Sequence, residues 1–487
     1  MPALSFLDRQ HSVAPAGYSR WLVPPAALAV HICIGQVYAT SVYKTQLIDT
    51  FHASETTIGL IFSIAVVVLG LSAAVFGPWV DRGGPRRAMF TAACCWGTGF
   101  LVASLGVATT QLWLVYLGYG VIGGIGLGIG YISPVSTLMK WFPDRPGLAT
   151  GMAIMGFGGG ALVASPLCTS LMSAYGAPST AALTAAAETA HGSGATAAAT
   201  DHFATLVTDT RHAVSLLLLT LGIAYFAFMM LGTFLVRVPA PGWMPHGFDP
   251  STVRTKAMVT TANVSANNAL RTPQFWLLWV VLLCNVTAGI GILENASPMI
   301  QDFFRGSNAP VGAATAAGFV GLLSIFNMGG RIVWSSASDG LGRKRTYMMY
   351  LGCGLVFYVL LSIVGDTTTA LFVILAALIV SFYGGGFSTA PAYLRDLFGT
   401  YQVGAIHGRL LTAWSTAGVL GPLIVNTVLD AQGTPGTLRA HDYLTALYIM
   451  VGILALGFVA NLFIRPVSER WTEKATVVDA VDAAHRG

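Results

Sequence analysis

Long apolar stretches separated by short polar loops run along nearly the whole chain. Residues 58–80 and 213–236 are almost entirely apolar, and each exceeds the roughly 20 residues that an α-helix needs to cross a bilayer. Strands of a membrane barrel would instead show short segments of alternating character, so the fold class is predicted to be all-α. The pattern predicts twelve membrane-spanning helices at 21–46, 58–80, 88–108, 112–140, 147–174, 213–236, 274–297, 309–337, 347–365, 369–394, 404–429 and 442–464.

The composition agrees with a membrane protein. Of the 487 residues, 54% are hydrophobic and 9% are charged, whereas a soluble domain has roughly 25% charged residues. The segment before Trp21 is polar, and the apolar run after it is long enough to span a bilayer. We therefore expect this run to remain as the first span rather than to be cleaved as a signal peptide.

The basic residues gather on one side of the predicted bundle. The opposite side holds only Lys44, Arg211, Arg305 and Arg439. Cytoplasmic loops carry the excess of lysine and arginine, so both termini are expected in the cytoplasm. The protein itself is expected in the inner (plasma) membrane of a bacterium. This bias also explains the net charge of +5 without nucleic acid. The basic residues assigned to the cytoplasmic side are Arg9, Arg20, Arg82, Arg86, Arg87, Lys140, Arg145, Arg237, Arg254, Lys256, Arg271, Arg343, Lys344, Arg345, Arg395, Arg465, Arg470, Lys474 and Arg486.

Two polar segments divide the apolar pattern. Residues 238–272 contain Pro, Asn and Thr without a long apolar run, and they separate the spans six and six. This segment is predicted to be a cytoplasmic linker between an N-terminal lobe at 1–237 and a C-terminal lobe at 273–465. The Ala/Thr-rich insertion at 176–212 is predicted to be an external, partly helical loop, and 466–487 a cytoplasmic tail.

The two halves repeat each other in sequence. The loop at 77–87 follows the second span, and a loop of the same pattern at 335–345 follows the eighth. Further on, a Gly-x-x-x-Gly motif opens the fifth span at 147–151 and the eleventh at 404–408. A duplication of this kind is typical of two-lobed transporters.

The Asp-Arg-x-Gly-x-Arg-Arg loop that begins at Asp81 resembles the signature of the major facilitator superfamily between the second and third helices. In that superfamily the aspartate and arginine latch neighbouring helices in one conformation. The resemblance implies this role for Asp81 with Arg82 and for Asp339 with Arg343.

A narrower resemblance rests on three pieces of sequence. Together they are similar to the oxalate/formate antiporter family, which is related to the monocarboxylate transporters. The resemblance implies small carboxylate substrates such as oxalate, formate, lactate or pyruvate, exchanged for one another or carried with a proton. The pieces are residues 128–151, Tyr383–Phe387 with Pro391, and Thr412–Trp414 with Gly418–Pro422.

Arg331 lies inside the eighth apolar run, eight residues before Asp339. A helix would place it roughly 12 Å into the membrane. An unpaired arginine there costs at least about 2.5 to 3.5 kcal/mol, so it should face a water-filled cavity or a partner, and its planar fork suits a substrate carboxylate. Asn327 lies one turn away on the same face and is expected to orient the guanidinium or to bind the ligand. The alternatives are a structural arginine bonded to helix carbonyls and an asparagine that joins two helices.

Four aromatic residues in the spans complete the predicted substrate site. Each alone is more often a packing residue, and the set is supported mainly by the resemblance to the family. They are Tyr38, Tyr131, Tyr383 and Trp414. The eleventh span departs from the pattern of the oxalate exchanger, because it has no Lys or Arg between Leu410 and Leu429. A single central cation matches a monoanion better than a dianion.

Proton coupling would require a titratable group in the spans. The candidates are His31, His407 and Glu294. His31 is the best placed, because histidine titrates near neutrality, but a histidine bonded between helices is an equal alternative.

The sequence is interpreted as an alternating-access carrier that acts as a monomer in the lipid bilayer, with no cofactor, metal or nucleic acid. Oxalate/formate exchange is the alternative substrate, and a non-transporting sensor of the same fold is the alternative class. An enzyme is disfavoured because no span holds a Ser/His pair, a carboxylate pair or a set of metal ligands. The six cysteines, which all lie in apolar runs, are expected to be buried packing residues.

Overall fold

The computed structural model describes residues 6–178, 182, 185–186, 189–190, 196–248, 258–260, 262–307, 310–433 and 438–473, apart from the side chains of residues 45, 55, 56, 313, 314 and 317. Within this part of the chain the structure is helical, and its single β contact is an isolated bridge between Val13 and Val238. The predicted all-α fold is thus confirmed. Of the predicted basic loop residues, four lie outside the described residues: Arg254, Lys256, Lys474 and Arg486.

The helices of the first half begin and end where the sequence offers local signals. Ser54 caps α3 by accepting a hydrogen bond from the backbone N–H of Thr57 at 3.2 Å. Gly84, with φ of 82°, makes the tight turn between α3 and α4. The elements are η2 (Arg9–Ser12), η3 (Arg20–Leu22), α1 (Pro24–Ile34), η4 (Gly35–Tyr43), α2 (Lys44–Phe51), α3 (Glu55–Gly83), α4 (Pro85–Ala108), α5 (Leu112–Val115), the π-helical η5 (Tyr116–Gly123), α6 (Gly124–Trp141), α7 (Pro146–Ala174) and α9 (Ala197–Leu235).

The second half repeats these features. Thr272 caps α11 by accepting from the backbone N–H of Phe275 at 3.3 Å. Gly342, with φ of 86°, turns the chain between α12 and α13 at the position that matches Gly84. The elements are α10 (Ala266–Ala269), α11 (Pro273–Phe303), α12 (Ala313–Leu341), α13 (Arg343–Val364), α14 (Thr369–Phe398), α15 (Val403–Asp430), η7 (Ala440–Tyr443), α16 (Leu444–Phe463) and η8 (Glu469–Trp471).

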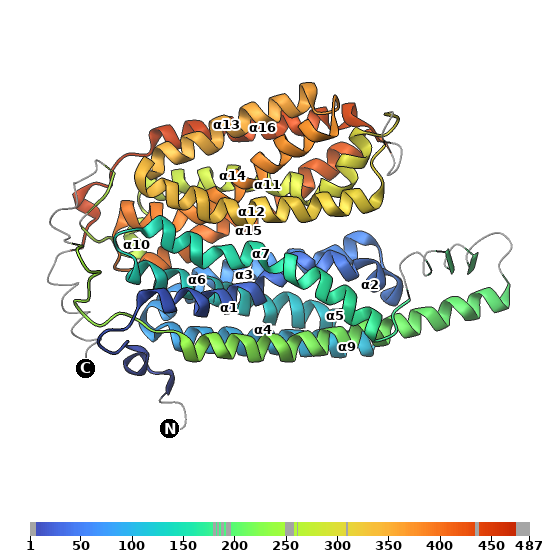
Figure 1. Ribbon diagram of the computed structural model, residues 1–487, viewed down its shortest axis with the longest axis horizontal. Helices are drawn as coiled ribbons and strands as arrows, with labels where there is room; N and C mark the ends of the chain where they lie inside the picture. Colours follow the sequence, from blue (N-terminus) through green and yellow to red (C-terminus); the bar gives the residue numbers. More distant parts are fainter. Residues whose placement is uncertain are drawn as a thin grey trace.

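In the described residues, 11 segments are long and apolar enough to cross a membrane. The 29-residue helix α12 is a further long helix, and it packs between α7 and α14 inside the bundle. Together they correspond to the twelve predicted spans, so the chain is a multi-pass membrane protein. α9 differs most from the prediction, because it begins at Ala197 instead of near residue 213. Alanine is the strongest helix former, and the Ala-rich end of the insertion continues this helix beyond the bundle (Figure 1).

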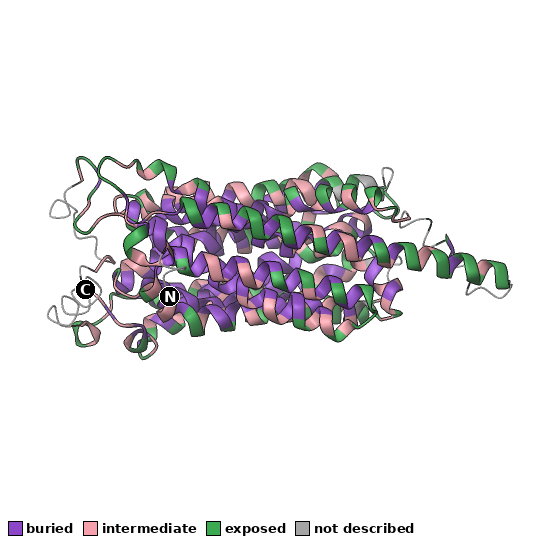
Figure 2. Ribbon diagram, turned by 90° about the horizontal axis from the view of Figure 1, so that it is seen from below, coloured by how far each residue is buried: buried purple, intermediate pink, exposed green. Residues whose placement is uncertain are grey.

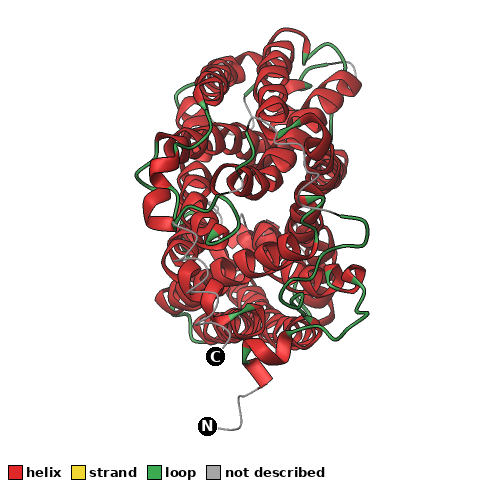
Figure 3. Ribbon diagram, turned by 90° about the vertical axis from the view of Figure 1, so that its left-hand side faces the viewer, coloured by secondary structure: helices red, strands yellow, loops and turns green. Residues whose placement is uncertain are grey.

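The two halves of the sequence lie side by side as two groups of helices with both termini at the same end, called here the terminal end (Figure 1). Seen from the terminal end, the molecule consists of helices joined by loops (Figure 3). Buried residues line the inside of the bundle, whereas exposed residues face outward (Figure 2). Several of these outward residues are large and apolar, including Val75, Ile363 and Phe463, as expected of a surface in contact with lipid.

The two halves meet along two helix pairs. α7 of the first half packs against α12 of the second, and α3 packs against α15. Close packing of α3 against α15 depends on glycine, since a Cβ at Gly77 would lie 2.8 Å from the Cα of Ala405. The candidate site lies between these pairs.

Candidate functional site

Arg331 is fully buried in the middle of α12. Its Nε donates a hydrogen bond to Oδ1 of Asn327 at 3.1 Å, and its Nη1 donates to the backbone carbonyl of Ile154 in α7 at 3.3 Å. Nη2 is buried and has no hydrogen-bond partner among the described residues. Nε and Nη1 are therefore each held by the protein, and Nη2 keeps donor capacity for a ligand.

Two phenylalanine rings flank this guanidinium. Cζ of Arg331 lies 5.1 Å from the ring centroid of Phe387 in α14 and 5.9 Å from that of Phe157 in α7. The ring of Phe387 lies 5.6 Å from Tyr131 and 5.3 Å from Trp414, and Phe157 lies 5.5 Å and 5.7 Å from the same two rings. These five side chains thus meet between the two halves of the molecule. We call Arg331, Tyr131, Phe157, Phe387 and Trp414 the central cluster.

Two further polar atoms of the central cluster have no partner in the described part of the chain. They are the hydroxyl of Tyr131 and Nε1 of Trp414, both on buried side chains. Leaving a buried polar group without a hydrogen bond costs about 1 to 3 kcal/mol, so such groups usually have a partner. Arginine and tryptophan nitrogens can only donate, and a tyrosine hydroxyl can also donate. The cluster therefore suits a ligand rich in acceptor oxygens.

Tyr38 and Tyr383 extend the cluster across the two halves. Their hydroxyls lie 3.4 Å apart, with Tyr38 in η4 and Tyr383 in α14. Tyr38 also meets the ring of Phe157 with centroids 5.2 Å apart. The structure therefore brings all six substrate-site residues predicted from the sequence to one region, from five different spans.

The two phenylalanines were not nominated as site residues from the sequence. Phe387 ends a glycine-rich motif and Phe157 lies within another, but an aromatic residue in an apolar span carries no signal that separates a site wall from packing. Their part in the cluster follows only from the way α7 and α14 meet α12.

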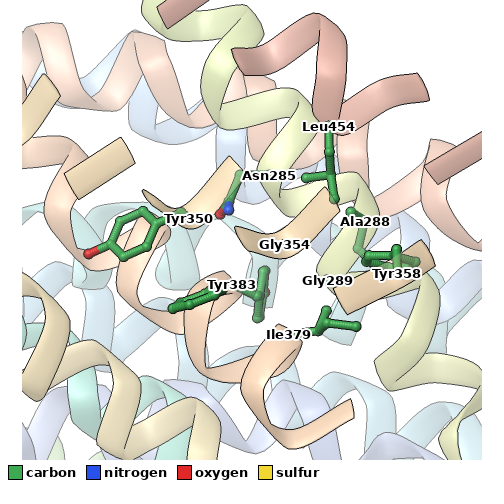
Figure 4. Close-up of a pocket in the computed structure, with 10 residues that line it drawn as sticks. Asn285, Ala288, Gly289, Tyr350, Gly354, Tyr358, Ile379, Tyr383 and Leu454 are labelled. Atoms are coloured by element: carbon green, nitrogen blue, oxygen red, sulfur yellow. The ribbon is translucent and has the colours of Figure 1, made fainter. Parts of the chain in front are cut away.

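A small pocket opens beside this cluster within the second half of the bundle (Figure 4). Tyr383 lines it together with Asn285, whose buried Oδ1 has no partner among the described residues. The lining carries no charged side chain, so it lacks the charge-assisted donor that Arg331 provides in the central cluster. The remaining lining residues are Ala288, Gly289, Tyr350, Gly354, Tyr358, Ile379, Phe382 and Leu454.

The three proton-coupling candidates lie in different surroundings. His31 is fully buried, and its ring nitrogens contact the backbone carbonyls of Ala153 and Tyr131, the latter at 3.2 Å. His407 is also buried and lies beside Tyr131, with ring centroids 5.7 Å apart. Glu294 is exposed on α11. The two histidines therefore adjoin the central cluster, whereas Glu294 stands apart from it.

At the terminal end, two aspartates each reach a helix of the opposite half. Oδ2 of Asp81 accepts from the backbone N–H of Ala405 in the first turn of α15 at 2.9 Å. Asp339 accepts from the backbone N–H groups of Gly147 and Leu148 in the first turn of α7 at 2.8 Å and 3.0 Å. A carboxylate at a helix N-terminus binds unsatisfied donors and complements the helix dipole. We call these two contacts the interlobe caps.

The arginines predicted to act with these aspartates behave differently. Arg343 is buried and pairs with Asp339 at 2.5 Å and with Asp396 at 3.2 Å. Arg82 is exposed, and its Nε donates to the carbonyl of Pro78 in its own helix at 3.1 Å. The structure thus places Arg343 within an interlobe cap and Arg82 outside one, and it adds Asp396, which the sequence did not single out.

Comparison with known proteins gives the context of this geometry. The family model described as Major Facilitator Superfamily matches residues 26–422. The chain is 24% identical over 404 residues to the oxalate:formate antiporter of Oxalobacter formigenes, with 83% of each chain covered. It is 27% identical over 364 residues to apicoplast pyruvate carrier 1 of Toxoplasma gondii, over 68% of this chain and 62% of the relative.

The fold itself is similar to that of solved membrane transporters. The E. coli fucose:proton symporter matches with a TM-score of 0.64 at 14% sequence identity, covering 92% of this chain and 100% of that chain. At this identity the likeness concerns the arrangement of the helices.

Proposed function

The chain belongs to the Major Facilitator Superfamily and is a membrane transporter, and on that premise we propose that its substrate is a small monocarboxylate anion of the formate, lactate or pyruvate type, carried by alternating access. The observation that carries the proposal is the buried guanidinium of Arg331, whose Nη2 has no partner among the described residues. A carboxylate is the ligand that a planar fork of N–H donors binds best. The relatives named for oxalate, formate and pyruvate support the same chemistry.

The surroundings of the guanidinium favour a ligand with one negative charge. Tyr131 and Trp414 add uncharged donors, and Phe157 and Phe387 add apolar walls. The described helix α15 carries no Lys or Arg between Leu410 and Leu429 that would balance a second carboxylate. A dianion such as oxalate would leave a charge uncompensated in a buried site, which is costly. Oxalate/formate exchange is the second candidate, supported by the relative from Oxalobacter formigenes.

Alternating access requires two lobes that move about the site, and we assign them to residues 1–237 and 273–465, joined by 238–272. With both termini in the cytoplasm of an inner-membrane protein, the terminal end faces inward. The interlobe caps then close the cytoplasmic side. The contact of Nη1 of Arg331 with Ile154 joins the same two lobes at the level of the site.

Exchange of two anions needs no titratable group, whereas symport with a proton needs one. His31 is the candidate closest to the cluster, because it contacts the backbone of Tyr131 and lies in the same lobe. Uptake that depends on substrate inside the vesicle would select exchange. Uptake driven by an inward proton gradient into vesicles free of substrate would select symport.

The experiment that tests the proposal is uptake of labelled formate, lactate, pyruvate and oxalate into proteoliposomes containing the purified protein. We expect at least one monocarboxylate to enter faster than into protein-free vesicles, and oxalate to compete more weakly. Transport of none of these anions, or a clear preference for oxalate, would contradict the monocarboxylate proposal.

A further inference from the structure

Arg331 lies directly against the backbone of α7 at Gly158. A Cβ built on Gly158 would lie 2.7 Å from Nε of Arg331, 3.1 Å from Cδ and 3.2 Å from Cζ. Real Cβ atoms almost never approach another atom as closely as the first of these distances. The arginine occupies this space only because residue 158 has no side chain.

The guanidinium has little room to move away. On its other sides lie the rings of Phe157 and Phe387, and Nε is also the atom that donates to Asn327. Nη1 bonds the carbonyl of Ile154, which lies one helical turn before Gly158 on α7. A methyl group at 158 would therefore act on a group held by four neighbours, and close-packed interiors transmit such strain.

The neighbouring glycine of α7 offers a different environment. A Cβ on Gly159 would meet the Sδ of Met328 at 2.7 Å and its Cγ at 3.6 Å. Met328 is also in α12, so both glycines contact the same helix of the other half. A methionine end is flexible and can rotate away, whereas the buried guanidinium cannot.

We propose that Gly158 is a positioning residue of the anion site: its missing side chain lets α7 hold Arg331 at the height and orientation in which Nη2 is presented to the substrate carboxylate. The inference rests on the proposed function, since it assigns Arg331 to the substrate. Gly158 acts through the arginine and touches no substrate itself.

The test is a double-mutant cycle of Gly158→Ala and Arg331→Ala, with Gly159→Ala as the matched control. Alanine at 331 removes the three atoms nearest to a Cβ at 158. Substrate binding is measured as the rise in thermal stability of purified protein with pyruvate or formate. The thermal stability without substrate is measured as well, because it needs no binding.

We expect Gly158→Ala to weaken binding about tenfold through displacement of the guanidinium, and Gly159→Ala to leave it nearly unchanged. Without substrate, Gly158→Ala should lower the melting temperature when Arg331 is present. With alanine at 331 the same change should raise it, because alanine is the better helix former. This reversal of sign is the signature of an effect that acts through Arg331.

Two results would overturn the inference: unchanged binding in Gly158→Ala, or the same change in melting temperature with and without Arg331. Both leave the proposed function intact if Arg331→Ala abolishes substrate stabilisation. Normal stabilisation in Arg331→Ala would instead contradict the proposed function, whatever Gly158 does.

Discussion

At the scale of single residues, the candidate site combines the polar pair Arg331 and Asn327 with two phenylalanine rings that flank the guanidinium. A charge inside an apolar run is conspicuous, and helical spacing alone places Asn327 beside Arg331, where the structure shows a hydrogen bond of 3.1 Å. Phe157 and Phe387 are chemically indistinguishable from packing residues until helices of both halves are placed together. The sequence therefore predicts the polar candidates of the site, and the tertiary structure shows which side chains surround them.

For Tyr131, we expect removal of the hydroxyl to have opposite effects on the stability of the free protein and on substrate binding. Its hydroxyl is buried without a partner in the described residues, so Tyr131→Phe should leave the free protein equally stable or slightly more stable. If the hydroxyl donates to the substrate, the same change should cost about 1 kcal/mol of binding, or roughly fivefold in affinity. Thermal stability with and without substrate measures both effects.

Tyr358→Phe is the matched control. The hydroxyl of Tyr358 donates to the carbonyl of Ala288 at 2.5 Å within the second half. Its removal should lower the stability of the free protein and leave substrate affinity unchanged. Unchanged affinity in Tyr131→Phe would remove Tyr131 from the substrate site.

At the scale of elements, the spans were largely predictable because their length and apolar character are set by the bilayer. The 176–212 insertion was predicted to be partly helical, but the start of α9 at Ala197 was not predicted, because a helix outside a membrane has no hydropathy signal that fixes its ends. For the interlobe caps, the sequence predicted only a repeated loop motif. The sequence shows that Asp81 and Asp339 occupy the same position of a repeated loop motif. It does not show that their partner helices, α15 and α7, come from the opposite half.

If the interlobe caps act as a latch, mutating them should affect the transport rate and the substrate affinity to different extents. Asp81→Asn or Asp339→Asn keeps the shape of the side chain and removes the charge that complements the helix N-terminus, worth about 0.3 to 1 kcal/mol or more when partly buried. Because the residues hold a conformation, each change should alter the transport rate more than substrate affinity. Transport in proteoliposomes and thermal stabilisation by substrate give the two quantities.

Arg82→Gln is the control for this pair of variants. Its guanidinium bonds only its own helix through the carbonyl of Pro78 in the described structure, so we expect near-normal transport. Equal losses of binding and rate in the aspartate variants would show that the caps do not act as a conformational latch.

At the scale of the whole molecule, the internal repeat explains why two groups of helices face each other around one site. Matching loops with Gly84 and Gly342 at positive φ place an aspartate of each half over a helix of the other. The duplication could be seen in the sequence. The meeting of the halves at Arg331 could not, because it depends on contacts between residues such as Ile154 and Arg331 that are distant in the chain.

The orientation in the membrane is the whole-molecule prediction. Reporters fused after Val238 and at the C-terminus should be cytoplasmic, and a reporter in the 176–212 insertion should be external, as the distribution of basic residues requires. The accessibility of each reporter in intact cells shows on which side of the membrane it lies. An external reporter after Val238 would contradict the two-lobe arrangement.

The proposed anion-carrier mechanism depends on Arg331 as the group that binds the substrate carboxylate. Purified wild-type, Arg331→Lys and Arg331→Gln proteins should be compared for the rise in melting temperature caused by a transported monocarboxylate, which reports binding without turnover. Lysine keeps the charge and cannot reproduce the planar fork, so both variants should bind more than about tenfold more weakly, a loss above roughly 1.5 kcal/mol. Each variant should insert into the membrane and be monodisperse after purification, which excludes misfolding as the cause of weaker binding. Substrate stabilisation of Arg331→Gln equal to that of the wild type would show that the arginine is structural and would contradict the anion-carrier mechanism.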